Sequence, residues 1–361
     1  MLNYIPFLLN MIRKEENIIL KPFMYVMGVI IDVAYNAISS ITPENALGLS
    51  IIALTIIVKT ITLPAAFKQQ KSMRAMQDLA PQIAEIDAKY GDSKDPELEK
   101  KKNIEKQNLY SKNKVNPLSG CLPALVTLPI FFALSYLFQQ VYVYVDAVGD
   151  VYNQLAIQLM SHDGYANVIL PMVSSRTQQG VIVNLYSIAD VMKAINIFSM
   201  DDWNRIFAVI PRAALPAFES KIVADTFLSI SLIDPSGWML PGILIPILSA
   251  GTSVLNTIVT MKRQTAGGDA QKKQQLIMTV VTTAMMFYFT VTMSAGLGIY
   301  WTTSNVYSFV QQILLDKFYK GGKAGKKKAA QALETPKKIE LVDNRNPKNK
   351  SSKNAGKEES Q

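Results

Sequence analysis

The chain has 361 residues, of which 49% are hydrophobic, and a formal net charge of +9 at pH 7. Because Cys121 is the single cysteine, no internal disulfide can form. His162 is the single histidine, so almost no residues are available for a Cys/His zinc site or a Ser-His-Asp triad. The sequence contains no Walker loop and no dinucleotide-binding fingerprint, so we expect no cofactor, no metal and no enzymatic activity.

The N-terminal segment, residues 1–41, starts with an apolar stretch that has no basic region before it and no clear cleavage site after it, unlike a signal peptide. The stretch Pro22–Ser40 is also apolar, but it is short, and Asp32 and Asn36 interrupt it. These features favour a helix that lies in the membrane interface over a helix that spans the bilayer.

The remainder of the chain contains apolar segments that are long enough to cross a bilayer, which takes about 20 mostly apolar residues. The last of them is roughly twice that length, and Ser294-Ala295-Gly296 in its middle indicates a tight turn between two helices. We therefore predict an all-α, polytopic membrane protein with five spans. They lie at Leu47–Phe67, Leu118–Tyr142, Met239–Met261 and the two halves of Leu276–Leu315.

Residues 68–114, between the first two spans, are predicted to form a helical hairpin. Apolar residues recur every three or four positions along its first arm, at Met73, Met76, Leu79, Ile83, Ile86 and Tyr90. Gly91-Asp92-Ser93 ends this pattern, a charged second arm follows, and Asn116-Pro117 turns the chain back to the membrane. The hairpin could dock an incoming chain, but composition alone favours a solvated helix pair.

Residues 144–238 are predicted to form an external, mostly helical lobe. His162, beside Asp163, is typical of a surface residue, and we identify no chemistry in this region. The predicted helix starts are a capping box of Ser199 and Asp202 ahead of Trp203–Ile210, Ser187 ahead of Ile188–Phe198, and Pro216 ahead of a helix to about Phe227.

Charge predicts the orientation of the spans. Residues 68–114 hold 11 basic and 8 acidic residues, residues 262–273 hold 4 and 1, and the tail, residues 317–361, holds 13 and 5. Residues 144–238 instead hold 5 basic and 9 acidic residues. Because positively charged loops stay in the cytoplasm, the first three regions are predicted inside and the lobe outside, an alternation that five spans satisfy.

The tail is rich in lysine, asparagine, serine and glycine from Gly321 onward and has few large apolar residues. Such a segment cannot bury enough apolar surface to fold alone, so we predict that it is disordered. A basic tail is attracted to anionic lipids and to the phosphates of RNA, and composition favours neither lipid nor ribosomal RNA as its partner.

Lys59 lies inside the first predicted span, where a charge costs about 2.5–3.5 kcal/mol on insertion scales and usually faces a protein interior or a wet cavity. Snorkelling is the alternative, but Lys68, the inner end of the span, is roughly 13 Å away along a helix. No acidic residue lies in the five spans to pair with Lys59. The other spans offer polar residues at Gln139, Gln140, Thr252, Ser253, Asn256, Thr257, Thr279, Thr282, Thr283, Thr302, Thr303, Ser304 and Asn305.

Each of these polar residues alone is expected to bond to its own backbone or to a neighbouring helix. Together they indicate a polar groove with a fixed positive charge. Such a groove is a poor path for cations, and it suits a transient host for polar, preferably acidic, polypeptide segments, because it lowers their desolvation cost.

Four stretches of this sequence resemble the YidC/Oxa/Alb family of membrane protein insertases, in its bacterial form. They are LTIIVKTITLPAAFKQQK at 54–71, MRAMQDLAPQI at 73–83, VNPLSGCLPALVTLPIFFAL at 115–134, and SAGLGIYW at 294–301 with the residues up to Gln312. Asp234-Pro235 and the span that follows are also similar. Order and spacing agree over roughly residues 42–143 and 230–317, whereas Tyr144–Ser229 does not match the core of the family, so nothing carries over there.

The resemblance implies a five-helix core around a hydrophilic groove, closed to the outside and open to the cytoplasm and to lipid, with a mobile cytoplasmic hairpin. It implies an insertase and folding chaperone in the bacterial cytoplasmic membrane, acting on nascent membrane proteins, alone or beside the Sec translocon, with a tail that engages ribosomes. Anionic lipids are the further partner that the basic tail indicates.

The resemblance also assigns residues. Lys59 stands where the family usually has arginine, so the positive charge is kept but the planar guanidinium group is lost. Asn256 stands where the family often has a polar amide, and Trp301 where an aromatic residue lines the groove. The predicted groove residues are Lys59, Asn256, Trp301, Gln139, Gln140 and Thr303, and the predicted hairpin residues are Met73, Met76, Leu79 and Pro81.

Two other functions compete with this interpretation. A small-solute transporter or channel would use the same groove, but five spans lack an obvious inverted repeat and no span carries an acidic residue. A structural assembly factor would pack Lys59 against backbone carbonyls. The predicted parts of the chain are 1–41, 42–67, 68–114, 115–143, 144–238, 239–316 and 317–361.

Overall fold

The computed structural model describes residues 20–91, 95–116, 122–177, 185–263 and 269–321. Cys121, the loop residues Asp92 and Ser93, and the tail beyond Gly321 therefore lie outside the described residues. The chain divides into two compact units, Met1–Gln311 and Gln312–Gln361, and of the second unit only Gln312–Gly321, the end of the last helix, is described. Apart from one two-stranded sheet and the loops, the described residues form helices, as the all-α prediction requires.

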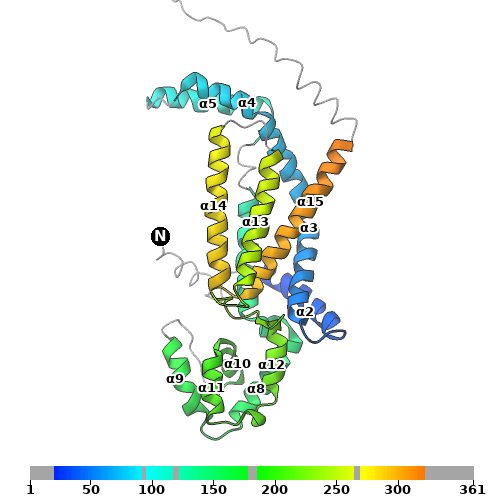
Figure 1. Ribbon diagram of the computed structural model, residues 1–361, viewed down its shortest axis with the longest axis vertical. Helices are drawn as coiled ribbons and strands as arrows, with labels where there is room; N and C mark the ends of the chain where they lie inside the picture. Colours follow the sequence, from blue (N-terminus) through cyan, green and yellow to red (C-terminus); the bar gives the residue numbers. More distant parts are fainter. Residues whose placement is uncertain (1–19, 92–94, 117–121, 178–184, 264–268, 322–361) are drawn as a thin grey trace, which may run out of the picture. The chain divides into compact units, whose positions relative to one another are not determined.

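Five long helices occupy the regions predicted to span the membrane (Figure 1). Within the described residues, Ala46–Ser72 has both the length and the apolarity of a span, with a mean hydropathy of 2.1, whereas three of the other helices contain shorter apolar stretches. The number of spans therefore stays a prediction. The five helices are α3 (Ala46–Asp78), α6 (Leu122–Gln139), α13 (Leu244–Arg263), α14 (Asp269–Thr292) and α15 (Ala295–Gly321).

The predicted turn inside the last apolar run is confirmed, since α14 ends at Thr292 and α15 begins at Ala295. The backbone N–H groups of Ala295 and Gly296 donate to the carbonyls of Asp234 and Leu232, at 2.8 and 2.9 Å. A Cβ atom on Gly296 would lie 3.1 Å from Cδ1 of Ile51 and 3.2 Å from the Leu232 carbonyl oxygen. Glycine thus allows the start of α15 to approach α3 closely.

Helix α2 (Lys21–Ser39) is the other described helix with the length and apolarity of a span, with a mean hydropathy of 1.3. Asp32, which interrupts its apolar sequence, accepts a hydrogen bond of 3.0 Å from the backbone N–H of Asp146, the first residue of α8 (Asp146–Met160). A carboxylate at this position stabilises the start of α8. Mid-helix Gly28 lies against Tyr144 of α7 (Val141–Tyr144), which follows α6. The interfacial position of α2 stays a prediction.

The hairpin consists of α4 (Ala80–Tyr90) and α5 (Pro96–Lys112). Helix α3 continues past residue 67, the predicted end of the first span, to Asp78, so it includes Met73 and Met76 of the predicted first arm. The break falls at Leu79, immediately before Ala80-Pro81, since proline lacks an N–H donor and favours the first turn of a new helix.

Ion pairs between charged side chains hold the two arms of the hairpin together. Asp87 lies 2.8 Å from Lys102 and 2.7 Å from Lys106, which lowers the pKa of its carboxyl group even though burial acts in the opposite direction. Glu105 accepts hydrogen bonds from Lys89 at 2.9 Å and from Tyr90 at 2.8 Å. Basic and acidic side chains of the predicted charged second arm thus pair with oppositely charged side chains of the first arm.

The region between α6 and α13 folds into a lobe of short helices, as predicted. They are α8, α9 (Tyr165–Thr177), α10 (Ile188–Ile197), α11 (Met200–Phe207), the 3₁₀ turn η2 (Arg212–Ala214) and α12 (Ala217–Asp225), followed by β1 (Thr226–Phe227) and β2 (Ile230–Ser231).

The capping box of Ser199 and Asp202 is confirmed at the start of α11. Ser187 occupies the N-cap position of α10, but its side chain makes no capping hydrogen bond. Pro216 precedes α12 as expected, and this helix ends at Asp225. This end is two residues before the predicted one at about Phe227, because Thr226 and Phe227 pair with Ser231 and Ile230 in an antiparallel ladder.

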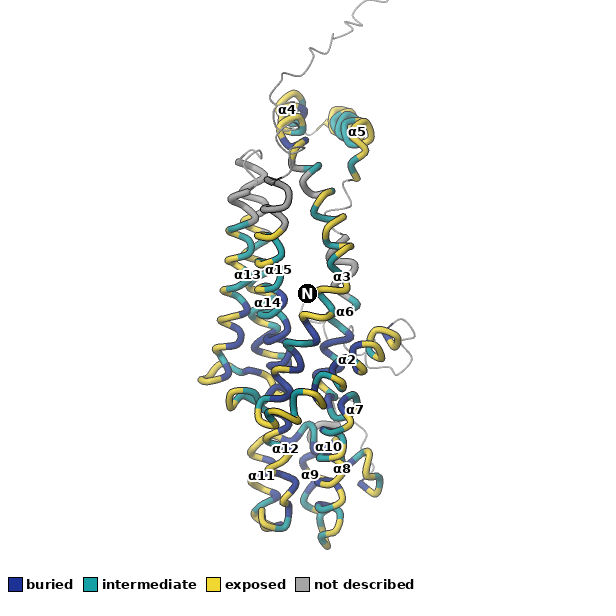
Figure 2. The backbone as a smooth tube through the Cα atoms, turned by 90° about the vertical axis from the view of Figure 1, so that its right-hand side faces the viewer, coloured by how far each residue is buried: buried dark blue, intermediate teal, exposed yellow. Residues whose placement is uncertain are grey.

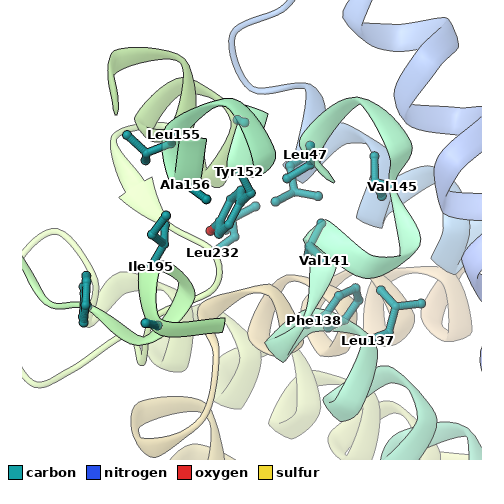
Figure 3. Close-up of a cluster of buried hydrophobic side chains, with 14 of the residues drawn as sticks. Leu47, Leu137, Phe138, Val141, Val145, Tyr152, Leu155, Ala156, Ile195 and Leu232 are labelled. Atoms are coloured by element: carbon teal, nitrogen blue, oxygen red, sulfur yellow. The ribbon is translucent and has the colours of Figure 1, made fainter. Parts of the chain in front are cut away.

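The core of the lobe is continuous with that of the long helices. Tyr152, Leu155 and Trp203 of the lobe are fully buried and belong to the same cluster as Leu47 and Phe138. Figure 3 shows the side chains where the two regions meet, with Tyr152 and Leu232 between Ile195 on one side and Leu47 and Val141 on the other. The lobe therefore packs onto the ends of α3 and α6 through a shared apolar interior.

A buried ionic cluster lies in this lobe. Asp225 accepts hydrogen bonds of 2.8 Å from the Lys221 ammonium and the Tyr152 hydroxyl, and the ammonium lies 5.4 Å from the centre of the Tyr152 ring. All three side chains are buried. Burial raises the pKa of the Asp225 carboxyl group, although Lys221 and Tyr152 oppose the rise. The cluster connects α8 to α12 and thereby stabilises the arrangement of the lobe.

Candidate functional site

Lys59 lies near the middle of α3 and is partly buried. Its ammonium donates a hydrogen bond of 3.3 Å to the hydroxyl group of Ser308 on α15. Within the described part of the chain, no carboxylate forms an ion pair with Lys59. Because an ammonium group has three N–H donors and the bond to Ser308 is long, Lys59 retains the capacity to bind an anionic group.

A second polar contact joins α3 and α15, between the residue after Lys59 and the residue before Ser308. The Thr60 hydroxyl lies 3.1 Å from the hydroxyl of Tyr307, and it also bonds to the carbonyl of Ile56 in its own helix. Lys59 and Thr60 thus face Ser308 and Tyr307. These four side chains form what we call the polar seam between α3 and α15.

Asparagine side chains connect α13 to α15. Asn256 donates a hydrogen bond of 2.8 Å to the backbone carbonyl of Asn305. Asn305 donates in turn to the carbonyl of Ser249 and to the hydroxyl of Thr252, both at 3.2 Å. This asparagine clamp, Asn256 with Asn305, resembles the interhelical bonds by which polar side chains hold membrane helices together.

Trp301 stacks on Phe131 of α6, with ring centres 5.3 Å apart and an interplanar angle of 18°. Phe131 also packs against Phe289 of α14, with ring centres 6.2 Å apart. Trp301 and Ser308 are seven residues apart on α15, which places them on one face two turns apart, roughly 10 Å along the axis. The aromatic stack and the polar seam therefore share one face of α15.

The remaining predicted groove residues lie at two different levels. Gln139 is the exposed last residue of α6, and its carbonyl accepts a hydrogen bond of 2.8 Å from Asn196 of the lobe helix α10. Gln140 follows as the N-cap of α7. Thr303 is half-buried and lies one turn before Tyr307 of the polar seam.

The two glutamines do not lie at the level of Lys59. Gly296 is in contact range of both Ile51 and Phe138, so Ile51 lies near the end of α6. Lys59 is eight residues further along α3, which is roughly 12 Å. Gln139 and Gln140 thus lie with the lobe, whereas Lys59 lies deeper among the long helices.

Burial changes along the long helices. Ile51, Leu54, Phe138 and Leu297 at the lobe end are fully buried. From Lys59 onward most residues of α3 are half-buried or exposed, as Figure 2 shows by the change from dark blue to teal and yellow along α3. The packed layer thus ends shortly before Lys59.

Sequence reasoning missed Ser308 and Tyr307. Serine and threonine in apolar helices usually bond to a carbonyl of their own helix, as Thr55, Thr252 and Thr302 do here. The spacing of Ser308 from Trp301 and Asn305 on one face of a predicted helix was the available signal. The partner on α3 could not be read from the sequence.

Comparison with known proteins identifies relatives. The family model described as 60Kd inner membrane protein matches residues 37–200 and 199–323. A protein of Fusobacterium nucleatum is 49% identical over 87 residues, 24% of this chain and 40% of the relative. A protein of Enterococcus faecalis is 45% identical over 98 residues, which are 27% of this chain and 35% of the relative. A protein of Oceanobacillus iheyensis is 47% identical over 89 residues, which are 25% of this chain and 35% of the relative.

All three relatives carry the name membrane protein insertase YidC. The chain spans less than half the length of each of them in these matches. The family match is broader, because its two segments together reach from residue 37 to residue 323 and include the helices that carry the polar seam, the asparagine clamp and the lobe.

Proposed function

Because this chain belongs to the 60Kd inner membrane protein family, the YidC/Oxa/Alb membrane protein insertases, we propose that it inserts other proteins into the bacterial cytoplasmic membrane and helps them fold. The observation that carries the proposal is Lys59, a lysine in an apolar helix that has a neutral hydroxyl as its recorded partner. In this role, the long helices α3, α6, α13, α14 and α15 surround a polar groove that receives segments of nascent membrane proteins.

The ammonium of Lys59 attracts the acidic residues of an incoming segment. Two unit charges 4 Å apart attract each other by about 4 kcal/mol at an effective dielectric constant of 20 and by about 1 kcal/mol in water. An aspartate at the centre of a spanning helix costs about 2.5–3.5 kcal/mol on insertion scales. Contact with Lys59 therefore offsets a large share of that cost wherever water is partly excluded.

Ser308 acts as a resting partner for Lys59 in this mechanism. Hydrogen bonds with one charged partner contribute about 1.5–3 kcal/mol, and those between two charged groups are stronger than a single charged–neutral bond. A bond of 3.3 Å to a hydroxyl group is long for an ammonium donor. A substrate carboxylate can therefore replace Ser308 at Lys59, and Ser308 takes the ammonium back when the segment leaves.

The other parts of the site hold the helices in place for this exchange. The asparagine clamp fixes α13 against α15, and the Trp301–Phe131 stack fixes α15 against α6. The packed layer around Ile51, Leu54, Phe138 and Leu297 closes the groove toward the lobe. Substrate segments accordingly enter from the side of the hairpin and from lipid.

The orientation and the partners belong to the same proposal. The basic regions, residues 68–114, 262–273 and 317–361, lie in the cytoplasm and the acidic lobe lies outside. The hairpin with Leu79 and Pro81 receives incoming chains, the basic tail engages ribosomes and anionic lipids, and the protein works alone or beside the Sec translocon.

A complementation experiment tests this function. The host's own insertase is depleted, and this chain is supplied with Lys59 intact, changed to arginine or changed to alanine. Lys68→Ala serves as the matched control, because Lys68 is an exposed lysine of the same helix. Insertion of a small test protein with an acidic translocated end is measured by protease protection, and membrane levels of each variant are measured in parallel.

The parent, Lys59→Arg and Lys68→Ala are expected to restore insertion, while Lys59→Ala fails at equal abundance. Full rescue by Lys59→Ala would show that apolar contacts carry insertion. Failure of every form at normal abundance would contradict the insertase function, and small-solute transport through the same groove would be tested next.

A further inference from the structure

Several highly exposed apolar side chains of the protein lie in loops at the lobe ends of the long helices. Ile41 lies between α2 and α3, Leu228 lies in the β1–β2 turn, and Trp238, Met239 and Leu240 precede α13. Their exposed fractions are 86, 68, 66, 81 and 75%. We call these five residues the apolar rim.

Leu228 is an unusual residue for its position. Leu228 and Ser229 both have positive φ values, of 49° and 66°, in the two-residue turn between β1 and β2. Turns of this kind favour Asn-Gly, because a left-handed backbone is costly for leucine and other residues with a large side chain. Within the described protein this leucine is largely uncovered, so the fold alone does not explain an apolar side chain there.

Two contacts hold the β1–β2 turn against the beginning of α3. The backbone N–H of Leu228 donates a hydrogen bond of 2.6 Å to the side-chain carbonyl of Asn45. A Cβ atom on Gly48 would lie 2.2 Å from the ring of Phe227, so only glycine permits this approach. Leu228 is therefore held beside the beginning of α3, where its partner Asn45 follows Ile41 by four residues.

Trp238 and its neighbours are held at the same level through α14 and α15. The N–H of Gly237 donates to the carbonyl of Val291 at 3.2 Å, and the Trp238 ring lies 6.0 Å from Phe287. Gly296 connects the two regions, because it contacts both Ile51 of α3 and the Leu232 carbonyl next to β2. The rim residues thus belong to one layer at the ends of the long helices.

We propose that the apolar rim inserts into the outer leaflet of the cytoplasmic membrane, at the boundary between headgroups and acyl chains. There it anchors the lobe to the lipid surface. Tryptophan is enriched at this depth, and exposed leucine, isoleucine and methionine gain hydrophobic stabilisation there. The exposed carboxylates Glu44 and Asp234 border the rim and remain among the headgroups. Continuity with the ends of the membrane helices favours lipid over a second protein as the occupant.

Site-directed spin labelling tests the proposal independently of insertase activity. Cys121 is changed to serine, and single cysteines replace Leu228, Met239 or, as a control, Val209. Val209 is an exposed valine in the turn after α11, a helix that packs against α9 of the lobe. The labelled proteins are reconstituted into vesicles of phosphatidylethanolamine and phosphatidylglycerol, after far-UV circular dichroism shows unchanged helix content.

Collision rates with oxygen and with a water-soluble nickel complex report the depth of each label. At positions 228 and 239 we expect a severalfold higher ratio of oxygen to nickel accessibility than at position 209, as for groups in contact with acyl chains. A ratio equal to that at position 209 would place the rim in water and overturn the proposal. Low accessibility to both reagents would also overturn it, because the rim would then be covered by protein.

Discussion

Replacement of Lys221 by methionine tests the buried cluster that supports the lobe. Lys221 and Asp225 are 5 and 2% exposed, and their charged atoms are 2.8 Å apart. Removal of one partner from a buried ion pair costs about 3–5 kcal/mol, because the other charge stays buried without compensation. Part of that loss is recovered if Asp225 takes up a proton, at about 1.36 kcal/mol per unit of pKa.

The assay is urea unfolding of the purified protein in detergent, followed by the emission of Trp203 after Trp238 and Trp301 are changed to phenylalanine. Trp203 reports the lobe, because it is buried against Phe218 with ring centres 4.7 Å apart. With an m-value of about 2 kcal/mol/M, the full loss corresponds to a fall in the transition midpoint of roughly 1.5–2.5 M, which proton uptake by Asp225 reduces.

Lys193→Met is the matched control. Lys193 is half-exposed and pairs with Asp190 at 2.9 Å on the surface, where ion pairs typically contribute about 0.2–1 kcal/mol. The two substitutions remove the same charge from the same lobe. Equal and small shifts for Lys221→Met and Lys193→Met would refute the argument that the Lys221–Asp225 pair acts as a buried one.

Three further predictions concern pH and helix packing. Burial raises the pKa of Asp225, so its carboxyl group binds a proton more tightly in the native than in the unfolded state. The contribution of this residue to lobe stability should therefore fall as pH rises from the usual aspartate range through the raised pKa. Urea titrations at several pH values should show this dependence, and Asp225→Asn should remove it. Asn305→Leu removes two side-chain bonds to α13 and should destabilise the bundle by about 0.6–1.7 kcal/mol in thermal unfolding, whereas unchanged stability would argue against the asparagine clamp. Gly296→Ala places a methyl group 3.1 Å from Ile51 and should cost about 1–3 kcal/mol in the same assay, with partial recovery when Ile51→Val is added.

The sequence predicted those elements that depend on local patterns. The long apolar runs coincide with α3, α6, α13, α14 and α15, and the small residues at 294–296 marked the turn before α15. The capping box at Ser199 was also predictable, because its partner Asp202 is three residues away. In each case the residues that determine the element lie within one or two turns of each other.

Features that distant or weak signals decide were not predicted. The polar stretch after Phe67 stays helical because no breaker occurs before Ala80-Pro81. The β1–β2 hairpin lacks the Asn-Gly signal that normally reveals such a turn. The partner of Asp32, the backbone N–H of Asp146, is 114 positions away in the chain, so no local pattern indicates it.

The same limit applies to the candidate site. Composition placed Gln139 and Gln140 among the groove residues, but their depth depends on where α6 ends relative to α3. Lys59 was identified because a charge in an apolar run is costly anywhere in the run. Its partner Ser308 is 249 positions away, and only the packing of α3 against α15 reveals it.

The central claim is that the charge of Lys59 acts on acidic substrate segments, and a charge-pairing measurement tests it most directly. Insertion of one test protein, with its translocated aspartate intact or changed to asparagine, is measured by protease protection with Lys59 and with Lys59→Ala at equal abundance. Our account predicts that Lys59→Ala impairs the acidic substrate strongly and the neutral one little. An equal loss for both substrates would contradict it, because Lys59 would then support the structure of the insertase and not the passage of charge.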